Sequence, residues 1–221
     1  MRLGLRLAFL VVPSFAALVS LPTPGREAGP RPVAFKGARI LPATSEPIDG
    51  GVLVIEGGKV VAVGGPDTPI PAGAAVIDAT GKTIIPGLVD THSHVGIWPR
   101  PHVQANQDGN EGSGAVQSGL RALDAIWPDD PGVRMAVAGG VTTANIMPGS
   151  GNVIGGQTLY VKLRGPSVEA MRIADMPVLG GLKMANGENP KGYGRRHEAP
   201  GTRMKVASLQ REQFAKARDY Q

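Results

Sequence analysis

Short runs of β-branched and apolar residues alternate with turn residues between positions 33 and 85. Runs of this kind, bounded by Gly, Pro, Asn and Asp, predict short strands. Gly57–Gly58 separates two of them and is typical of a hairpin turn. The predicted strands are Val33–Ile40, Gly51–Glu56, Lys59–Val63, Ala74–Asp78 and Lys82–Ile85. They leave no room for a helix, so we expect a small, structural β unit here.

Beyond this unit, apolar strands alternate with segments of helical periodicity. Thr83–Val89 is apolar except for Pro86–Gly87, and such a continuous run predicts a strand buried on both faces, as in a parallel sheet. Alternating strands and helices favour βα units. Further strands are predicted at Val141–Met147 and Val178–Met184, and helical segments at Ser113–Ile126, Val133–Ala138 and Thr202–Tyr220. We therefore expect an α/β fold.

The first residues have the pattern of a secretory signal peptide. Arg2 and Arg6 form a basic start, and Leu7–Val19 is largely apolar but too short to span a bilayer comfortably. We expect residues 1–20 to be removed on export to the periplasm or the exterior. Residues 21–32 are then a flexible Pro- and Gly-rich leader. The alternative is an uncleaved N-terminal anchor; after cleavage we expect no stable membrane insertion.

Composition narrows the functional classes. The chain has no cysteine, which excludes disulfides, thiolate metal ligands and Cys nucleophiles. Its net charge is +5, but the Lys and Arg residues form no long block and do not interleave with aromatics, so we expect no nucleic-acid partner. Hydrophobic residues make up 42% of the chain, which suits a globular protein more than a disordered one.

The strongest chemical signal is Asp90-Thr-His-Ser-His94 at the end of the predicted buried strand. Side chains alternate along a strand, so Asp90, His92 and His94 are expected on one face. Two imidazoles at this spacing can approach one cation, and neutral imidazole suits Zn²⁺, Fe and Ni. We expect His92 and His94 to bind metal and Asp90 to orient a ligand histidine. The alternative for His92 and His94 is a pair of ordinary histidines in a strand-end loop. The alternative for Asp90 is a structural carboxylate.

These segments carry a family resemblance. The stretch from Gly81 to His94 closely resembles the first barrel strand of the amidohydrolase superfamily, and Ala138–Thr143 resembles its second. Within the superfamily, these motifs resemble those of the imidazolonepropionase-related branch. The stretch Gly181–Lys191 also resembles exported members of that branch. Residues 33–84 then correspond to the N-terminal part of a small β-sandwich domain, and residues 85–221 to the first portion of a (β/α)₈ TIM-type barrel.

The resemblance implies a metal-dependent hydrolase of a C–N bond in a non-standard peptide, cyclic amide or amidine. Its cofactor would be one or two divalent ions, most simply Zn²⁺, with Fe, Ni or Mn as alternatives, and its partner a small-molecule substrate. A homo-oligomer is a further expectation for the full-length protein. The competing hypotheses are a non-catalytic remnant or binding module of the same fold and a purely structural β protein.

One departure from the family pattern concerns the remaining ligands. His102 and His197 are the other histidines, and neither ends an apolar strand. The segment after residue 84 is shorter than the roughly 250 residues of a full barrel. We therefore expect a partial barrel whose general base lies beyond residue 221, so that these residues alone are inactive.

Three further residues are candidates for contact with a substrate: Lys183, Glu188 and Tyr193. They follow a predicted strand, and strand ends are where barrel enzymes place such groups. The alternative is a solvated loop with ordinary salt bridges. Gly149–Gly156 could be a phosphate loop, but it lacks the Lys-Ser/Thr ending of that motif, so an active-site loop is the simpler interpretation.

Overall fold

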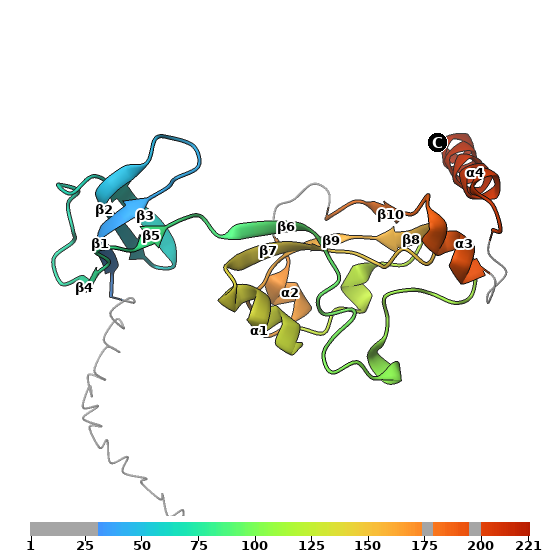
Figure 1. The fold of residues 1–221 in the computed structure, drawn as a ribbon, viewed down its shortest axis with the longest axis horizontal. Helices are drawn as coiled ribbons and strands as arrows, with labels where there is room; N and C mark the ends of the chain where they lie inside the picture. Colours follow the sequence, from blue (N-terminus) through green and yellow to red (C-terminus); the bar gives the residue numbers. More distant parts are fainter. Residues whose placement is uncertain (1–30, 174–178, 195–199) are drawn as a thin grey trace, which may run out of the picture. The chain divides into compact units, whose positions relative to one another are not determined.

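The computed structural model describes residues 31–173, 179–194 and 200–221, with side chains for all of these except residues 192–194. The chain divides into two compact units, and the division falls between Ile84 and Ile85. Figure 1 shows the elements of each unit. Among the helices of the described residues, none combines the length and the apolar character that a membrane crossing requires.

The first unit is a five-stranded sheet. Its strands run in the order β3-β2-β1-β4, with β5 also paired to β1. The strands are β1 (Val33–Ile40), β2 (Ile48–Glu56), β3 (Lys59–Gly64), β4 (Ala75–Asp78) and β5 (Thr83–Ile84). The prediction of five strands is thus confirmed, with shifts at some ends. A β-sandwich stays a prediction, since the unit described is one sheet.

Turn chemistry sets the register of this sheet. Gly57 and Gly58 have φ of 57° and 76°, values that L side chains rarely adopt, and they close the β2–β3 hairpin at the Glu56–Lys59 pair. The strand β1 pairs antiparallel with β2 and parallel with β4 and β5. Small clusters of apolar side chains bury its inner positions, and they centre on Ala34, Val52, Val54, Ala38, Ile40 and Ala79.

The second unit contains a three-stranded sheet in the order β6-β7-β9. It also contains a two-stranded sheet formed by β10 and β8. The strands are β6 (Leu88–Ser93), β7 (Val141–Ile146), β8 (Ile154–Gln157), β9 (Leu159–Lys162) and β10 (Leu182–Met184). The helices are α1 (Pro131–Ala138), α2 (Val168–Met171), α3 (Glu188–Gly194) and α4 (Arg203–Tyr220), with short 3₁₀ turns at Gln104–Asn106 and Ala122–Asp124.

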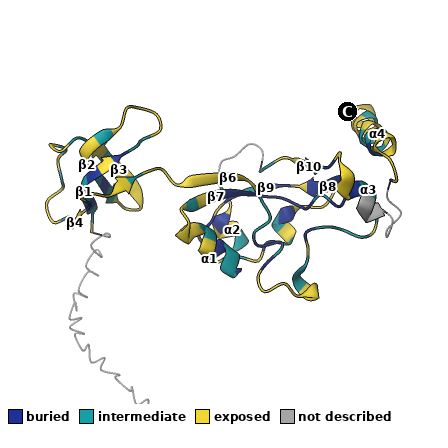
Figure 2. Ribbon diagram, in the orientation of Figure 1, coloured by how far each residue is buried: buried dark blue, intermediate teal, exposed yellow. Residues whose placement is uncertain are grey.

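The central strand β7 separates two environments. On one face, Ala144 and Ile146 are buried in the main core of the unit, together with Leu159, Val161 and Met171. Figure 2 shows this strand as largely buried, and Figure 1 shows α1 and α2 on the same side of the sheet. Since side chains alternate along a strand, Thr143 and Asn145 face the opposite side. That opposite side carries the candidate site.

The prediction that β6 is buried on both faces is wrong. Leu88 and Val89 are 49% and 56% exposed. The described residues give β6 one neighbour, the parallel strand β7, so it is an edge strand and its side chains lack cover from a second neighbour. The sheet is also mixed, because β9 runs antiparallel to β7 without a crossover helix between them.

The predicted helix at Ser113–Ile126 is also wrong. The segment is irregular except for the 3₁₀ turn at Ala122–Asp124. Gly114 and Gly119 weaken a helix here, because glycine costs about 1 kcal/mol relative to alanine. The backbone pairs with β8 instead: Gln117 N donates to Ile154 O at 2.8 Å, and Gln157 N donates to Leu120 O at 2.7 Å.

The remaining elements largely match the prediction. The helical turn at Val133–Ala138 lies in α1, the strand at Val141–Met147 corresponds to β7, and the helix at Thr202–Tyr220 corresponds to α4 with Thr202 as its N-cap. Of the strand predicted at Val178–Met184, only β10 is formed, and Val178 lies outside the described residues. The fold is therefore mixed α/β, as predicted.

A buried carboxylate fixes the loop that follows β6. Asp130, 1% exposed, is the N-cap of α1, and Pro131 occupies the first turn. Its Oδ1 accepts hydrogen bonds from Gly132 N at 2.8 Å and Arg100 N at 3.1 Å, and its Oδ2 accepts one from Gly96 N at 2.9 Å. The side chain thus joins the start of α1 to the loop just beyond the two histidines.

We predict that Asp130→Ala lowers the free energy of unfolding by about 2 kcal/mol or more, because it removes the helix cap and leaves buried N–H groups unpaired. The matched control is Asp129→Ala, which removes the neighbouring exposed carboxylate. Urea unfolding of both variants measures the difference. Equal midpoints for the two variants would contradict this role.

Candidate functional site

The predicted histidine pair lies where two parallel strands end. The strand β6 ends at Ser93 and its parallel neighbour β7 ends at Ile146, and these two residues are paired in register. The ring centroids of His92 and His94 are 5.3 Å apart, and the ring planes are at 87° to each other. The two imidazoles therefore lie close enough to contact one small cation.

The His94 ring is held on two sides. Its Nδ1 lies 2.7 Å from the carbonyl oxygen of Met147, directly after β7. Since a carbonyl only accepts, Nδ1 carries the proton and Nε2 keeps its lone pair. The Trp98 ring contacts His94 edge-to-face, with centroids 4.8 Å apart. Main-chain and aromatic contacts thus fix both the tautomer and the orientation of this ring.

Burial lowers the pKa of His94 from its usual value of 6.5. The hydrogen bond to Met147 acts in the opposite direction, while nearby Lys183 and His92 lower the pKa further and Asp90 raises it. The lowered pKa keeps the half-buried imidazole neutral near neutral pH, and neutral imidazole is the form that binds a metal ion.

His92 contacts a lysine from a distant part of the chain. Lys183 Nζ lies 3.3 Å from His92 Nε2 and 3.5 Å from the Met147 sulfur. A charged ammonium has no acceptor, so this contact requires a lone pair on His92 Nε2, again the form that a metal ion binds. Burial lowers the pKa of Lys183.

The antiparallel pairing of β10 with β8 brings Lys183 to the histidines. Lys183 lies opposite Gly156, and a Cβ placed on the adjacent Gly155 would lie 3.6 Å from the Lys183 Cγ. The lysine stem therefore runs alongside β8 at ordinary van der Waals distance from Gly155. The sequence alone predicts Lys183 near a strand end but gives no sign of its contact with His92.

Asp90 lies beside the pair through the main chain. Its Oδ1 accepts a hydrogen bond from His92 N at 3.0 Å, so within the described residues the contact is with the His92 backbone and not with an imidazole nitrogen. This arrangement can order the end of β6. An orienting role for Asp90 toward a ligand histidine stays a prediction.

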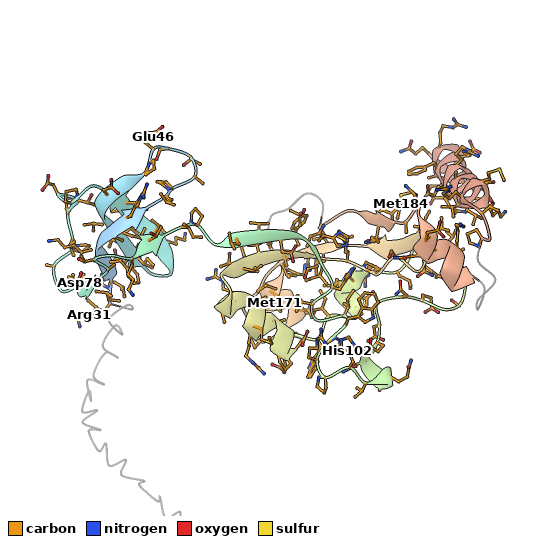
Figure 3. All side chains as sticks on the ribbon, in the orientation of Figure 1. Arg31, Glu46, Asp78, His102, Met171 and Met184 are labelled. Atoms are coloured by element: carbon orange, nitrogen blue, oxygen red, sulfur yellow. The ribbon has the colours of Figure 1, made fainter. Side chains whose placement is uncertain are left out.

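The other predicted residues are placed differently. Glu188, at the start of α3, is exposed and forms a salt bridge with Lys191 at 3.1 Å, which matches the alternative of an ordinary surface pair. Tyr193 lies in α3, but its side chain is outside the described set, as is all of His197. His102 lies beside the 3₁₀ turn at Gln104–Asn106 (Figure 3), and its Nδ1 is 3.3 Å from Gln107 Oε1.

Of the Gly149–Gly156 segment, residues 149–153 form a loop and residues 154–156 begin β8. Asn110 Oδ1 accepts from Gly151 N at 2.6 Å, and Gly149 N donates to Gly109 O at 2.6 Å. The buried Asn152 donates to Gly114 O at 2.8 Å. Because these main-chain amides already have acceptors, the geometry favours a supporting loop over a phosphate-binding loop.

The residues present fit a two-histidine contribution to a metal centre. His94 donates its Nδ1–H to a carbonyl, the usual arrangement of a ligating histidine, while His92 Nε2 lies 3.3 Å from Lys183 Nζ, a contact that a bound ion would displace. Within the described ranges, no group of three or more His, Cys, Asp or Glu is close enough together to hold a metal ion. Among the described residues, His92 and His94 are therefore the two candidate metal ligands at this site.

Two groups that hold the site were missed by the sequence analysis. The Met147 carbonyl belongs to the main chain, so its role has no residue-type signal at all. Trp98 does have one: it follows His94 by four residues, and its backbone N donates to His94 O at 3.0 Å, so a turn folds the indole back onto the imidazole. An aromatic residue just after a His-x-His pair is a signal that could have identified it.

Comparison with known proteins agrees with this geometry, although no family model matches the chain. The amidohydrolase tasK of Hapsidospora irregularis is 32% identical over 218 residues, covering 86% of this chain and 22% of that protein. A dihydroorotase of Pelobacter propionicus is 35% identical over 115 residues, covering 51% of this chain and 22% of its own length. These names are those of hydrolases that act on C–N bonds.

A solved structure gives the same indication. An amidohydrolase from Thermotoga maritima MSB8 superposes with a TM-score of 0.77 at 40% identity, covering 85% of this chain and 48% of that one. The chain thus spans about a fifth of the two curated relatives and about half of the structural one. The sheets, the strand-end histidines and these likenesses together support the placement of the chain in the amidohydrolase superfamily.

Proposed function

We propose that the chain forms part of a metal-dependent hydrolase that cleaves a C–N bond of a small molecule, such as a cyclic amide, an amidine or a non-standard peptide. The observation that carries the proposal is the His92–His94 pair, in which the Met147 carbonyl holds the His94 ring. The similarity to an amidohydrolase over 85% of the chain supports the same chemistry. The imidazolonepropionase-related branch is our assignment within the superfamily.

The architecture we propose is the first portion of a (β/α)₈ barrel. The parallel pair β6 and β7, with α1 between them in the sequence, is one βαβ unit. Its histidines lie at the carboxyl ends of the strands, the end at which barrel enzymes carry their active sites. The exposed outer side of β6 is consistent with a further neighbour in a closed barrel.

The proposed ligands are His92 Nε2 and His94 Nε2. A bound divalent ion such as Zn²⁺ would lower the pKa of a bound water, so that hydroxide could attack a carbonyl or amidine carbon near neutral pH. The part played by His94 is to remain neutral and correctly turned, which its lowered pKa and its bond to Met147 both favour. Asp90 holds the backbone of His92.

Lys183 is proposed as the group that binds the substrate oxygen. Its Nζ is 3.3 Å from His92 Nε2, so any group bound by His92 also lies within reach of the lysine. An ammonium in a partly desolvated position stabilises negative charge that develops on an oxygen. Lys183 would thus polarise the scissile carbonyl from the side of β10.

Export is proposed from the first residues, which lie outside the described part of the chain. The support is the basic start and the apolar run that follows it.

The metal assignment predicts that the double change His92→Ala with His94→Ala abolishes stoichiometric metal binding, because it removes both proposed ligands. His102→Ala is the matched control, since His102 is exposed and contacts only Gln107 in the described structure. Elemental analysis after equilibration with Zn²⁺ gives the metal content. A double variant with a full complement of metal would show that the ion binds elsewhere.

The role of Lys183 predicts that Lys183→Met lowers kcat/KM by about 100-fold while metal content is kept, because a charge-stabilising donor is lost and the ligands are not. Lys191→Met serves as the control, since among the described residues its ammonium pairs with the exposed Glu188. Turnover of the full-length protein is measured on a panel of cyclic imides, lactams and dipeptides. Unchanged turnover of Lys183→Met on every active compound would remove Lys183 from the mechanism.

Export predicts that mature protein begins between about Ala17 and Ala28, where small residues follow the apolar run. N-terminal sequencing of protein from the periplasm or the medium determines the start. Replacing Leu10 and Val11 with Asp is expected to block processing, since a charged pair breaks the apolar segment. Cytosolic protein that retains Met1 in the wild type would contradict export.

A further inference from the structure

Asn145 is a buried polar residue that packing does not explain. It lies in β7, and its side chain is 8% exposed. Its neighbours in the strand, Ala144 and Ile146, belong to the main core, so strand alternation turns Asn145 to the other face. Thr143 and Met147 share that face, and they contact Lys162 and Lys183 respectively.

The carboxamide of Asn145 reaches the strand that carries the histidines. Its Nδ2 donates to the carbonyl oxygen of Thr91 at 3.4 Å, a long hydrogen bond that crosses from β7 to β6. Since a carbonyl cannot donate, this contact fixes which end of the amide is nitrogen. The Thr91 carbonyl belongs to the peptide that leads directly into His92.

The other end of the same carboxamide has no partner. Asn145 Oδ1 is buried, and no donor among the described residues reaches it. Buried polar groups are nearly always paired, and an apolar side chain of similar size would fill this position at lower cost to folding. An asparagine that is half-paired in the fold is therefore a sign of a requirement other than stability.

We infer that Asn145 is a positioning residue for the His92–His94 site. Its Nδ2 holds the Thr91–His92 peptide from the site face of β7. The strand β7 then orients both histidines: His94 through the Met147 carbonyl and His92 through Asn145. This inference rests on the proposed metal function and adds a residue to it that contacts neither imidazole.

The test compares metal affinity in two variants of the whole chain. Asn145→Leu removes both polar ends at similar volume, and Asn145→Thr removes the carboxamide with a β-branched residue that suits a strand. Zn²⁺ affinity is measured by competition with a chromophoric chelator, and the Co²⁺ absorption spectrum reports ligand geometry. Thermal unfolding of the metal-free proteins reports folding separately.

We expect each Asn145 variant that folds to bind Zn²⁺ about 10–100-fold more weakly and to change the Co²⁺ spectrum, as when a residue that supports a ligand histidine is lost. Thr143→Val is the matched control: Thr143 lies on the same face of β7, but its hydroxyl accepts a hydrogen bond from Lys162 Nζ at 2.9 Å, and the variant should keep wild-type affinity. Rescue of the wild-type Co²⁺ spectrum by Asn145→Gln would further support a carboxamide requirement.

Two results would overturn the inference. If Asn145→Leu and Asn145→Thr bind Zn²⁺ within twofold of the wild type, Asn145 has no part in positioning and only this inference is lost. If the wild type itself binds no Zn²⁺ through His92 and His94, the proposed function is lost as well. The wild-type titration therefore distinguishes the two failures.

Discussion

The hydrogen bond between His94 Nδ1 and the Met147 carbonyl is the contact on which the candidate site depends. It joins the ends of two neighbouring parallel strands, and it decides which nitrogen of His94 is left with a lone pair. Without it, the imidazole could turn or take the other tautomer, and its Nε2 lone pair would no longer be available beside the His92 ring, whose centroid lies 5.3 Å away. A main-chain group is well suited to this task because the β6–β7 pairing fixes its position.

The strand β7 therefore has two roles that alternate along its length. Ala144 and Ile146 anchor it in the core, and burial of such apolar side chains gives the strand its stability. The residues between and after them face the site, where Met147 contacts His94 and Lys183. Because the same strand carries the core residues and the residues that contact the site, packing of the core also fixes the positions of the site groups. The loop beyond β6 is held in turn by buried Asp130, which caps α1.

Local patterns in the sequence predicted much of this arrangement, and the failures have physical causes. The strands of the first unit and the helix α4 were found because turn glycines and periodic apolar residues mark them directly. The helix predicted at Ser113–Ile126 does not form: the apolar spacing of the segment is helical, but its glycines and its backbone hydrogen bonds to β8 favour an irregular path. The exposure of β6 was missed because a run of apolar residues does not reveal how many neighbouring strands a chain provides.

In the candidate site, too, local features could be predicted from the sequence and long-range contacts could not. The His-x-His spacing at a strand end identified His92 and His94 as a pair, and Lys183 was placed at another strand end. Long-range contacts could not be predicted from the sequence: the Met147 carbonyl, the packing of Trp98 on His94 and the approach of Lys183 to His92 all depend on strand register.

Nitrogen NMR of the histidine rings tests most directly the claim that the Met147 carbonyl fixes the tautomer of His94. We predict that His94 is protonated at Nδ1 in metal-free protein, and that Zn²⁺ shifts the Nε2 signals of His92 and His94 while the His94 Nδ1 proton is retained. Protonation of His94 at Nε2, or Zn²⁺ shifts at neither ring, would contradict it.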